Sequence, residues 1–138
     1  MAYGAAKTAY ASVTAQTASP QRLLTMLYDR LILDLVLAEA AMRTGDHETT
    51  GNRLQHAQDI LLELWASLDE EAWPDGAPLR SLYLWLVSEL LGSRMPPQPD
   101  RLIVCRELLE PLRDAWKQAL ELQATGGLAA PATVHGAA

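Results

Sequence analysis

The sequence predicts an all-α protein: an antiparallel four-helix bundle with a loosely held N-terminal arm and a disordered C-terminal tail. Hydrophobic residues make up 49% of the 138 residues, yet there is no Phe, and the abundant Leu and Ala favour helices over strands. Glycine and proline number only 8 each. Apolar residues recur at helical spacing in four segments separated by turn-forming residues. A chain of this length fits one domain.

Residues 1–18 contain too little apolar surface to form a stable element, so we expect a loosely held arm. The first helix is expected to begin at Ser19 and Pro20. The Ser19 hydroxyl can cap free backbone amides, and Pro20 suits the first helical position, where an N–H would have no partner. This helix should run to about Thr44 and stop at Gly45.

The second helix is expected to begin after Asp46 as its cap and to continue through Leu68, with Gly51 fraying its first turns. The segment 69–78 is rich in turn formers and should end it. A third helix is then predicted from near Pro78 to Gly92.

The proline-rich break at 95–99 is followed by a fourth predicted helix from about Asp100 to Leu120, with a kink at Pro111. Residues 19–124 would therefore form the bundle, because four amphipathic helices with short connections favour antiparallel packing. The tail, 125–138, is small and uncharged, and we expect it to be disordered.

The charge balance argues against nucleic acid as a partner. The chain has 11 Lys and Arg against 17 Asp and Glu, a net charge of −6, whereas binding to phosphates needs a basic surface. Membrane insertion is not expected either, because Asp34 and Glu39 interrupt the most apolar stretch. The chain has a single cysteine, which cannot form an internal disulfide, and we see no N-terminal signal peptide with a basic and then an apolar region. Both observations favour a cytoplasmic location.

The residue patterns of enzymes and of metal sites are missing from the sequence. It has no G-x-S-x-G motif, phosphate-binding glycine loop or E-x-x-H pair. His56, Asp59 and Glu63 share one side of the second helix, but this is its polar side beside Asn52, which favours a solvated surface over a metal site. Cys105 lies on the apolar stripe of the fourth helix and should be a buried, inert thiol. We expect no catalysis, metal or cofactor.

Apolar surface is in excess on the first three helices. From Leu31 to Met42 the first helix is apolar nearly all round, as expected of a helix covered on more than one side. The third helix places Leu84, Trp85 and Leu91 outside its main stripe, whereas the fourth keeps its apolar residues on one side. Either the first helix is simply central in a tight bundle, or a groove receives an apolar segment of a partner. For the second case, the predicted groove residues are Leu24, Tyr28, Leu31, Leu35, Leu61, Leu62 and Trp65.

One long motif near the N-terminus resembles that of a known protein family. It is Tyr10-x-x-Val13-x-x-x-Thr17-Ala18-Ser19-Pro20-x-x-Leu23-Leu24-x-Met26-Leu27-Tyr28-Asp29, and it resembles the opening of the flagellar export chaperone FliS family. Further similarities follow in the same order to about residue 120: Gly45-Asp46, Ala57-Gln58-Asp59-Ile60, Glu63-Leu64, Ser67-Leu68-Asp69, Leu82-Tyr83, Leu86, Leu108-Leu109 and Leu112-Arg113-x-Ala115-Trp116.

The resemblance implies a helical bundle in the cytosol of a flagellated bacterium that is not an enzyme. It would bind the disordered C-terminal segment of flagellin, prevent premature polymerisation and help deliver flagellin to the flagellar type III export gate. We expect a monomer or a weak homodimer. The chain departs from the family pattern at Arg30, where a small residue is common, and at Gly92-Ser93-Arg94, which replaces the usual Ala-Asn ending of the third helix. The alternative is a generic regulatory or self-associating helical module.

The arm carries only three large apolar side chains, Tyr3, Tyr10 and Val13. We expect them to fold over the groove as a lid when flagellin is absent and to be displaced when it binds. The net closure should be weak, because ordering the arm costs conformational entropy. The alternative is a disordered segment whose tyrosines have no role.

Overall fold

The computed structural model describes residues 19–126. This part of the chain is all-α, with no strand, which confirms the predicted fold class. Its four α-helices are α2 (Pro20–Arg43), α3 (His47–Ser67), α4 (Ala77–Gly92) and α5 (Pro99–Gly126). A short 3₁₀ turn, η2 (Pro74–Gly76), precedes α4. The predicted arm lies outside the described residues, as does all of the tail after Gly126.

The predicted starts of the first two helices are confirmed. Ser19 Oγ accepts a hydrogen bond from the Arg22 backbone N–H at 3.2 Å, and Pro20 occupies the first turn of α2. Asp46 Oδ1 accepts from the Thr49 N–H at 3.1 Å and so caps α3. Hydrogen bonds from the Thr49 side chain and then from its backbone N–H lower the pKa of Asp46, because they stabilise the carboxylate.

Three local features differ from the sequence prediction. Helix α3 is regular through Gly51, and the Arg94 guanidinium packs where a Cβ at Gly51 would lie. Helix α5 is longer than predicted, because it continues to Gly126; Pro111 lies inside it, as predicted. The η2 turn places Trp73 against Gly76, so a close approach to the glycine backbone shapes the entry into α4.

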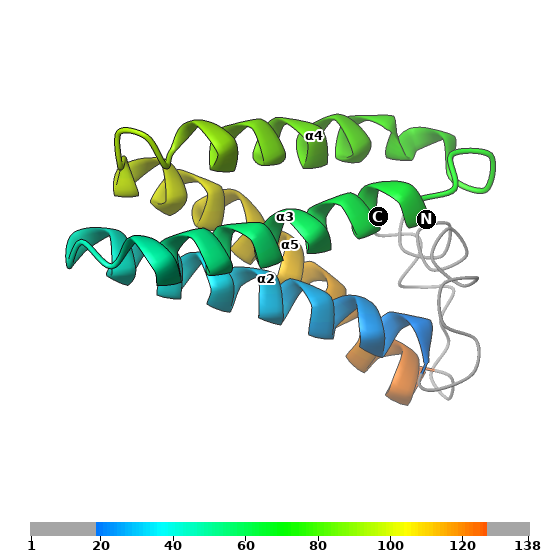
Figure 1. Ribbon diagram of the computed structural model, residues 1–138. Coiled ribbons are helices and arrows are strands. Elements are labelled where there is room, and N and C mark those ends of the chain that lie inside the picture. Colours follow the sequence, from blue (N-terminus) through cyan, green and yellow to red (C-terminus); the bar gives the residue numbers. More distant parts are fainter. Residues whose placement is uncertain (1–18, 127–138) are drawn as a thin grey trace.

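Consecutive helices run in opposite directions across the picture (Figure 1). Helix α2 packs extensively against both α3 and α5, and α3 also packs against α4. Helix α5 lies beside α4 near their joining loop and then crosses behind α3 to run along α2 (Figure 1). The contact between α4 and α5 is therefore the least extensive of the four contacts between α-helices around the bundle.

The core consists mainly of leucines from all four helices, with two buried tyrosines among them. Tyr28 of α2 and Tyr83 of α4 are both fully buried. The largest apolar side chains of the core are almost completely removed from water, which supplies most of the favourable free energy of folding. They are Tyr28, Leu31, Leu35, Leu54, Leu61, Leu64, Tyr83, Leu86, Leu90, Leu102 and Leu109.

Candidate polypeptide-binding surface

Most residues of the predicted groove lie in the core of the bundle. Five of the seven are buried: Leu24, Tyr28, Leu31, Leu35 and Leu61. The physical reason is the central position of α2, whose wide apolar arc is covered by α3 on one side and α5 on the other. Their burial shows no open groove at these positions in the described bundle, and their part in binding a partner stays a prediction. They fit the first interpretation of the apolar excess, a helix packed on two sides by its own chain.

The other two predicted groove residues reach the surface beside α4. Leu62 is 44% exposed. Trp65 is half-buried, and the guanidinium carbon of Arg80 lies 4.3 Å from its ring centroid. Such a cation–π contact adds a modest attraction between α3 and α4. Leu62 and Trp65 thus remain accessible candidates for contact with a partner, while the lid residues Tyr3, Tyr10 and Val13 lie outside the described residues.

An exposed apolar patch extends from α3 to α4, and we call Leu62, Leu84 and Leu91 the α3–α4 patch. All three side chains are exposed. The contacts of Arg80 with Trp65 and of Arg94 with Gly51 fix the antiparallel register of the two helices, which places Leu84 opposite Leu62. The sequence already indicated this surface, since Leu84 and Leu91 fall outside the main stripe of their helix.

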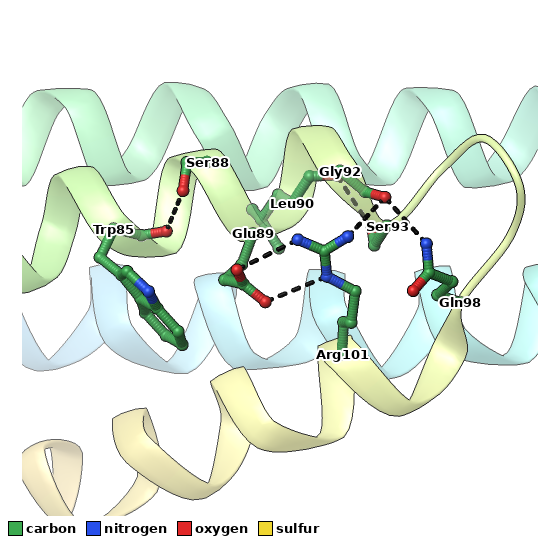
Figure 2. A network of polar contacts seen from close by, with 8 residues as sticks. All are labelled: Trp85, Ser88, Glu89, Leu90, Gly92, Ser93, Gln98 and Arg101. Carbon is green, nitrogen blue, oxygen red and sulfur yellow. Dashed lines mark hydrogen bonds and ion pairs between the residues drawn. The ribbon is translucent and has the colours of Figure 1, made fainter.

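A second patch lies where α4 and α5 meet, and we call Trp85, Val104 and Leu108 the α4–α5 patch. Trp85 is 42% exposed, and Val104 and Leu108 are also exposed. In Figure 2 the Trp85 indole extends from α4 on the side that carries Glu89, toward α5. The apolar side of the fourth helix is therefore not fully covered at this edge, because α4 and α5 contact each other so little.

Arg101 fastens the ends of α4 and α5 next to this patch (Figure 2). Its Nε donates to Glu89 Oε1 at 3.0 Å, and its Nη2 donates to Oε2 at 3.1 Å. Its Nη1 donates to the Gly92 carbonyl at 2.8 Å, and Gln98 Nε2 donates to the same carbonyl at 3.3 Å. These bonds from Arg101 hold the pKa of Glu89 below its ordinary value.

Gly92 leaves room for this arrangement. A Cβ at this position would lie 2.7 Å from both Nη1 and Nη2 of Arg101, so any larger residue would push the guanidinium away. The departure from the family pattern at Gly92-Ser93-Arg94 therefore has a local structural reason, which the sequence did not reveal because Arg101 lies in the next helix.

A buried carboxylate joins α2 to α3 on another side of the bundle. Asp34 is fully buried, and it accepts hydrogen bonds from Arg53 Nη1 at 3.2 Å and pairs with His56 Nδ1. His56 keeps 44% of its side chain exposed, yet it also reaches the buried Asp34 on the facing helix, a contact that its place on the polar side of α3 did not reveal. Asp59 and Glu63 are exposed, as expected. A buried carboxylate needs such partners, because an unpaired charge in the core is costly.

The described residues offer no site for metal or thiol chemistry. Between residues 19 and 126 there is no cluster of His, Cys, Asp and Glu that could hold a metal ion. Cys105 is buried, as predicted, and burial raises the pKa of its thiol to about 12. A thiol with such a pKa is not a nucleophile at neutral pH. Nor is any described helix long and apolar enough to span a membrane.

The fold and its surface define a class of protein: a helical bundle that displays large apolar side chains on several helices, as is typical of proteins that bind other polypeptides. The comparisons with known proteins make the class specific. The family model described as "Flagellar protein FliS" matches residues 2–123, and the chain belongs to the FliS family of flagellar secretion chaperones. This is a family of chaperones and not of enzymes.

Several curated relatives carry the name flagellar secretion chaperone FliS. The protein from Escherichia coli is 32% identical over 118 residues, which cover 81% of this chain and 87% of the relative. The protein from Vibrio cholerae is 31% identical over 102 residues, 73% of this chain and 75% of the relative. The Bacillus subtilis protein is 28% identical over 127 residues, 88% and 95% of the two chains. The family resemblance stated from the sequence is thus confirmed.

Proposed function

We propose that this protein binds the disordered C-terminal segment of flagellin in the cytosol, prevents premature polymerisation and helps deliver flagellin to the flagellar type III export apparatus. The observation that carries the proposal is the pair of exposed apolar patches, on α3–α4 and α4–α5, in a member of a secretion chaperone family. The names of the relatives, flagellar secretion chaperone, support the same function.

The two patches suit a partner that binds as an extended or helical segment. They lie on neighbouring surfaces, and α4 contributes to both of them, so one segment that crosses α4 can contact both. Disordered segments often wrap around a partner in this way and become ordered on binding. Trp85 is the strongest candidate for an anchor, because half-exposed tryptophans beside apolar neighbours frequently dominate binding energies.

The proposed binding surface therefore consists of exposed or half-exposed residues. Two of its residues, Leu62 and Trp65, were predicted from the sequence. The others are Leu84 and Leu91 of the α3–α4 patch and the three residues of the α4–α5 patch. The five buried residues of the predicted groove act indirectly, by holding α3, α4 and α5 in position. The arm with Tyr3, Tyr10 and Val13 stays a proposed lid that competes weakly with flagellin.

Binding of this kind accounts for both proposed effects without catalysis or a cofactor. A flagellin segment held on the apolar patches is not free to pair with another flagellin, so filaments do not form in the cytosol. The chaperone and its cargo can then be recognised together at the export gate, and the bound segment is released there.

Polymerisation of purified flagellin tests the proposal. Seeded filament growth, followed by light scattering, should stop when the chaperone is equimolar with flagellin. Trp85→Ala and Leu108→Ala should weaken this inhibition, whereas Glu107→Ala, an exposed polar change on the same helix as Leu108, should not. Filament growth that proceeds unchanged in the presence of excess chaperone would contradict the proposal.

A further inference from the structure

The α4–α5 patch lies beside the bonds that join these two helices. On α4, Trp85 precedes Glu89 by four residues. On α5, Val104 and Leu108 follow Arg101 by three and seven residues. Residues at these spacings share one side of a helix. Since Glu89 and Arg101 bind each other, the sides of α4 and α5 that carry the patch also face each other.

Different neighbours hold the two halves of α5. Near its start, Arg101 binds both carboxylate oxygens of Glu89 and the Gly92 carbonyl, all on α4. In its second half, Lys117 Nζ lies 3.2 Å from Asp29 Oδ1 on α2. Helix α5 therefore runs from α4 at Arg101 to α2 at Lys117, as Figure 1 shows.

The two helices diverge beyond Arg101, and the patch lies where the divergence begins. In Figure 2, α5 descends away from α4 on the side of the Trp85 indole. The limited contact between the two helices agrees with this view. Trp85, Val104 and Leu108 stay exposed because neither helix covers the side chains of the other here. Their relative positions therefore depend on the angle at which α4 and α5 are joined.

The bonds of Arg101 are suited to fix that angle, and we call Arg101, Glu89 and Gly92 the α4–α5 latch. Two parallel bonds from a guanidinium to a carboxylate fix orientation as well as distance. The third bond, to the Gly92 carbonyl, ties the guanidinium to the end of α4. The Arg101 and Glu89 side chains are only 32% and 21% exposed, so water competes with their bonds only in part.

The latch is not what keeps α5 in the bundle. Leu102 and Cys105, in the turn that follows Arg101, are fully buried in the core, and burial of such side chains holds the helix in place. Helix α4 likewise keeps its own contact with α3 through Arg80 and Trp65. Losing the latch should therefore change the angle between α4 and α5 without detaching either helix.

We propose that the α4–α5 latch positions Trp85 against Val104 and Leu108 and so prepares this patch to receive the flagellin segment. The inference rests on the proposed function, because it concerns the affinity of the same surface. A patch whose side chains are already in place has less freedom to lose when a partner binds, which raises the affinity. Arg101 is a positioning residue, since it acts on the partner through Trp85 and Val104.

Calorimetric titration of Arg101→Gln with the C-terminal flagellin segment tests the proposal. Glutamine cannot form the paired bonds to Glu89, so Kd should rise about three- to tenfold, the cost of ordering a side chain such as that of Trp85 on binding. Arg101→Lys keeps the charge but not the planar, two-pronged geometry, and it should recover only part of the affinity. An Arg101→Gln variant that binds as the wild type does would overturn the proposal.

Arg106→Gln is the matched control, because it removes an arginine of the same helix that binds across to a different neighbour. Arg106 Nη2 donates to Glu39 Oε1 of α2 at 3.0 Å, and 25% of the Arg106 side chain is exposed. This variant should lose stability as Arg101→Gln does, but it should bind the flagellin segment with the wild-type affinity. Equal losses of affinity in the two variants would reduce the latch to a stabilising bond and overturn its positioning role.

Spin labels on α4 and α5 report the angle between the helices without flagellin. Ser81→Cys and Gln118→Cys provide exposed sites for the labels, whereas Cys105 is buried and should stay unlabelled. In pulsed EPR, the distribution of label distances should be narrow in the wild-type background, broad with Arg101→Gln and narrow with Arg106→Gln. A distribution that Arg101→Gln leaves unchanged would overturn the proposal. A wild type that does not bind flagellin would refute the proposed function, while the label distances still decide whether the latch sets the angle, so the two failures are distinguishable.

Discussion

The phenol oxygens of Tyr28 and Tyr83 lie 2.7 Å apart, so a hydrogen bond links α2 to α4 through the centre of the bundle. The Tyr28 ring also packs at a tilt against Trp116 of α5, with 6.5 Å between ring centroids. Burial raises the pKa of Tyr28, and its hydrogen bonds with Tyr83 and Trp116 oppose this effect only in part. Three helices therefore meet at this neutral, hydrogen-bonded tyrosine.

Tyr28→Phe should lower the free energy of unfolding by about 1 to 2 kcal/mol, because it keeps the ring but leaves Tyr83 with one hydrogen-bond partner fewer in the core. Urea unfolding measures this loss. Tyr83→Phe should cost a similar amount, and the double variant should cost less than the sum of the two. Strictly additive losses would show that the two hydroxyls do not interact.

The helices could be predicted from the sequence because local chemistry determines where they begin. Ser19, Pro20 and Asp46 act within one turn of the chain, and the structure shows the predicted bonds at Ser19 and Asp46. Gly45 ends the turn with a φ of 76°, in the region that favours glycine. The η2 turn was missed, because it depends on Trp73 packing over Gly76.

The binding surface could be predicted only in part, since the sequence shows that a helix is apolar but not how many neighbours cover it. Leu31 and Leu35 looked like surplus apolar surface and are core, because α2 has both α3 and α5 against it. Leu108 looked like core and is exposed, because α4 contacts α5 so little. The pairing of Asp34 with His56 was hidden for a related reason: it joins residues 22 positions apart on different helices.

Replacing a core leucine should lower the stability of the fold, whereas replacing a surface leucine should weaken flagellin binding. Leu35→Ala should lower the free energy of unfolding by about 2 to 5 kcal/mol, because it leaves a cavity at a fully buried site. Leu62→Ala should change it by less than about 0.5 kcal/mol and should weaken flagellin binding instead. Urea unfolding and a binding titration on the same preparations compare the two. The proposed surface is wrong if Leu62→Ala and Trp85→Ala bind flagellin as the wild type does.

The bonds between Glu89 and Arg101 should make stability depend on pH. The folded-state pKa of Glu89 is lowered, so its contribution is present above the ordinary carboxyl value of 4.5 and is lost as the pH falls through the folded-state pKa. Arg101→Gln should raise the pKa of Glu89 toward that value, which NMR titration of the carboxyl carbon can follow. The variant should be less stable than the wild type at neutral pH, and the difference should shrink in acid. If the difference in unfolding free energy between the variant and the wild type stays constant down to about pH 3, the stabilisation does not come from the Glu89–Arg101 bonds.

Cys105 should react with a thiol reagent only after the bundle unfolds. Burial raises its thiol pKa to about 12, so almost no thiolate forms at neutral pH, and the reagent has no path to the sulfur. Labelling with a chromogenic disulfide in native buffer should be slow and should become fast in urea at the unfolding midpoint. Rapid labelling of the native protein would mean that α5 separates from the core.

The central claim, that exposed apolar patches hold the C-terminal segment of flagellin, is tested most directly by calorimetric titration of the protein with that segment at several temperatures. Ordering of a disordered segment on apolar surface should give saturable binding with a clearly negative heat-capacity change. Trp85→Ala should reduce both the affinity and the size of that change, whereas Glu107→Ala should alter neither. No binding, or binding with a heat-capacity change near zero that Trp85→Ala does not affect, would contradict the account.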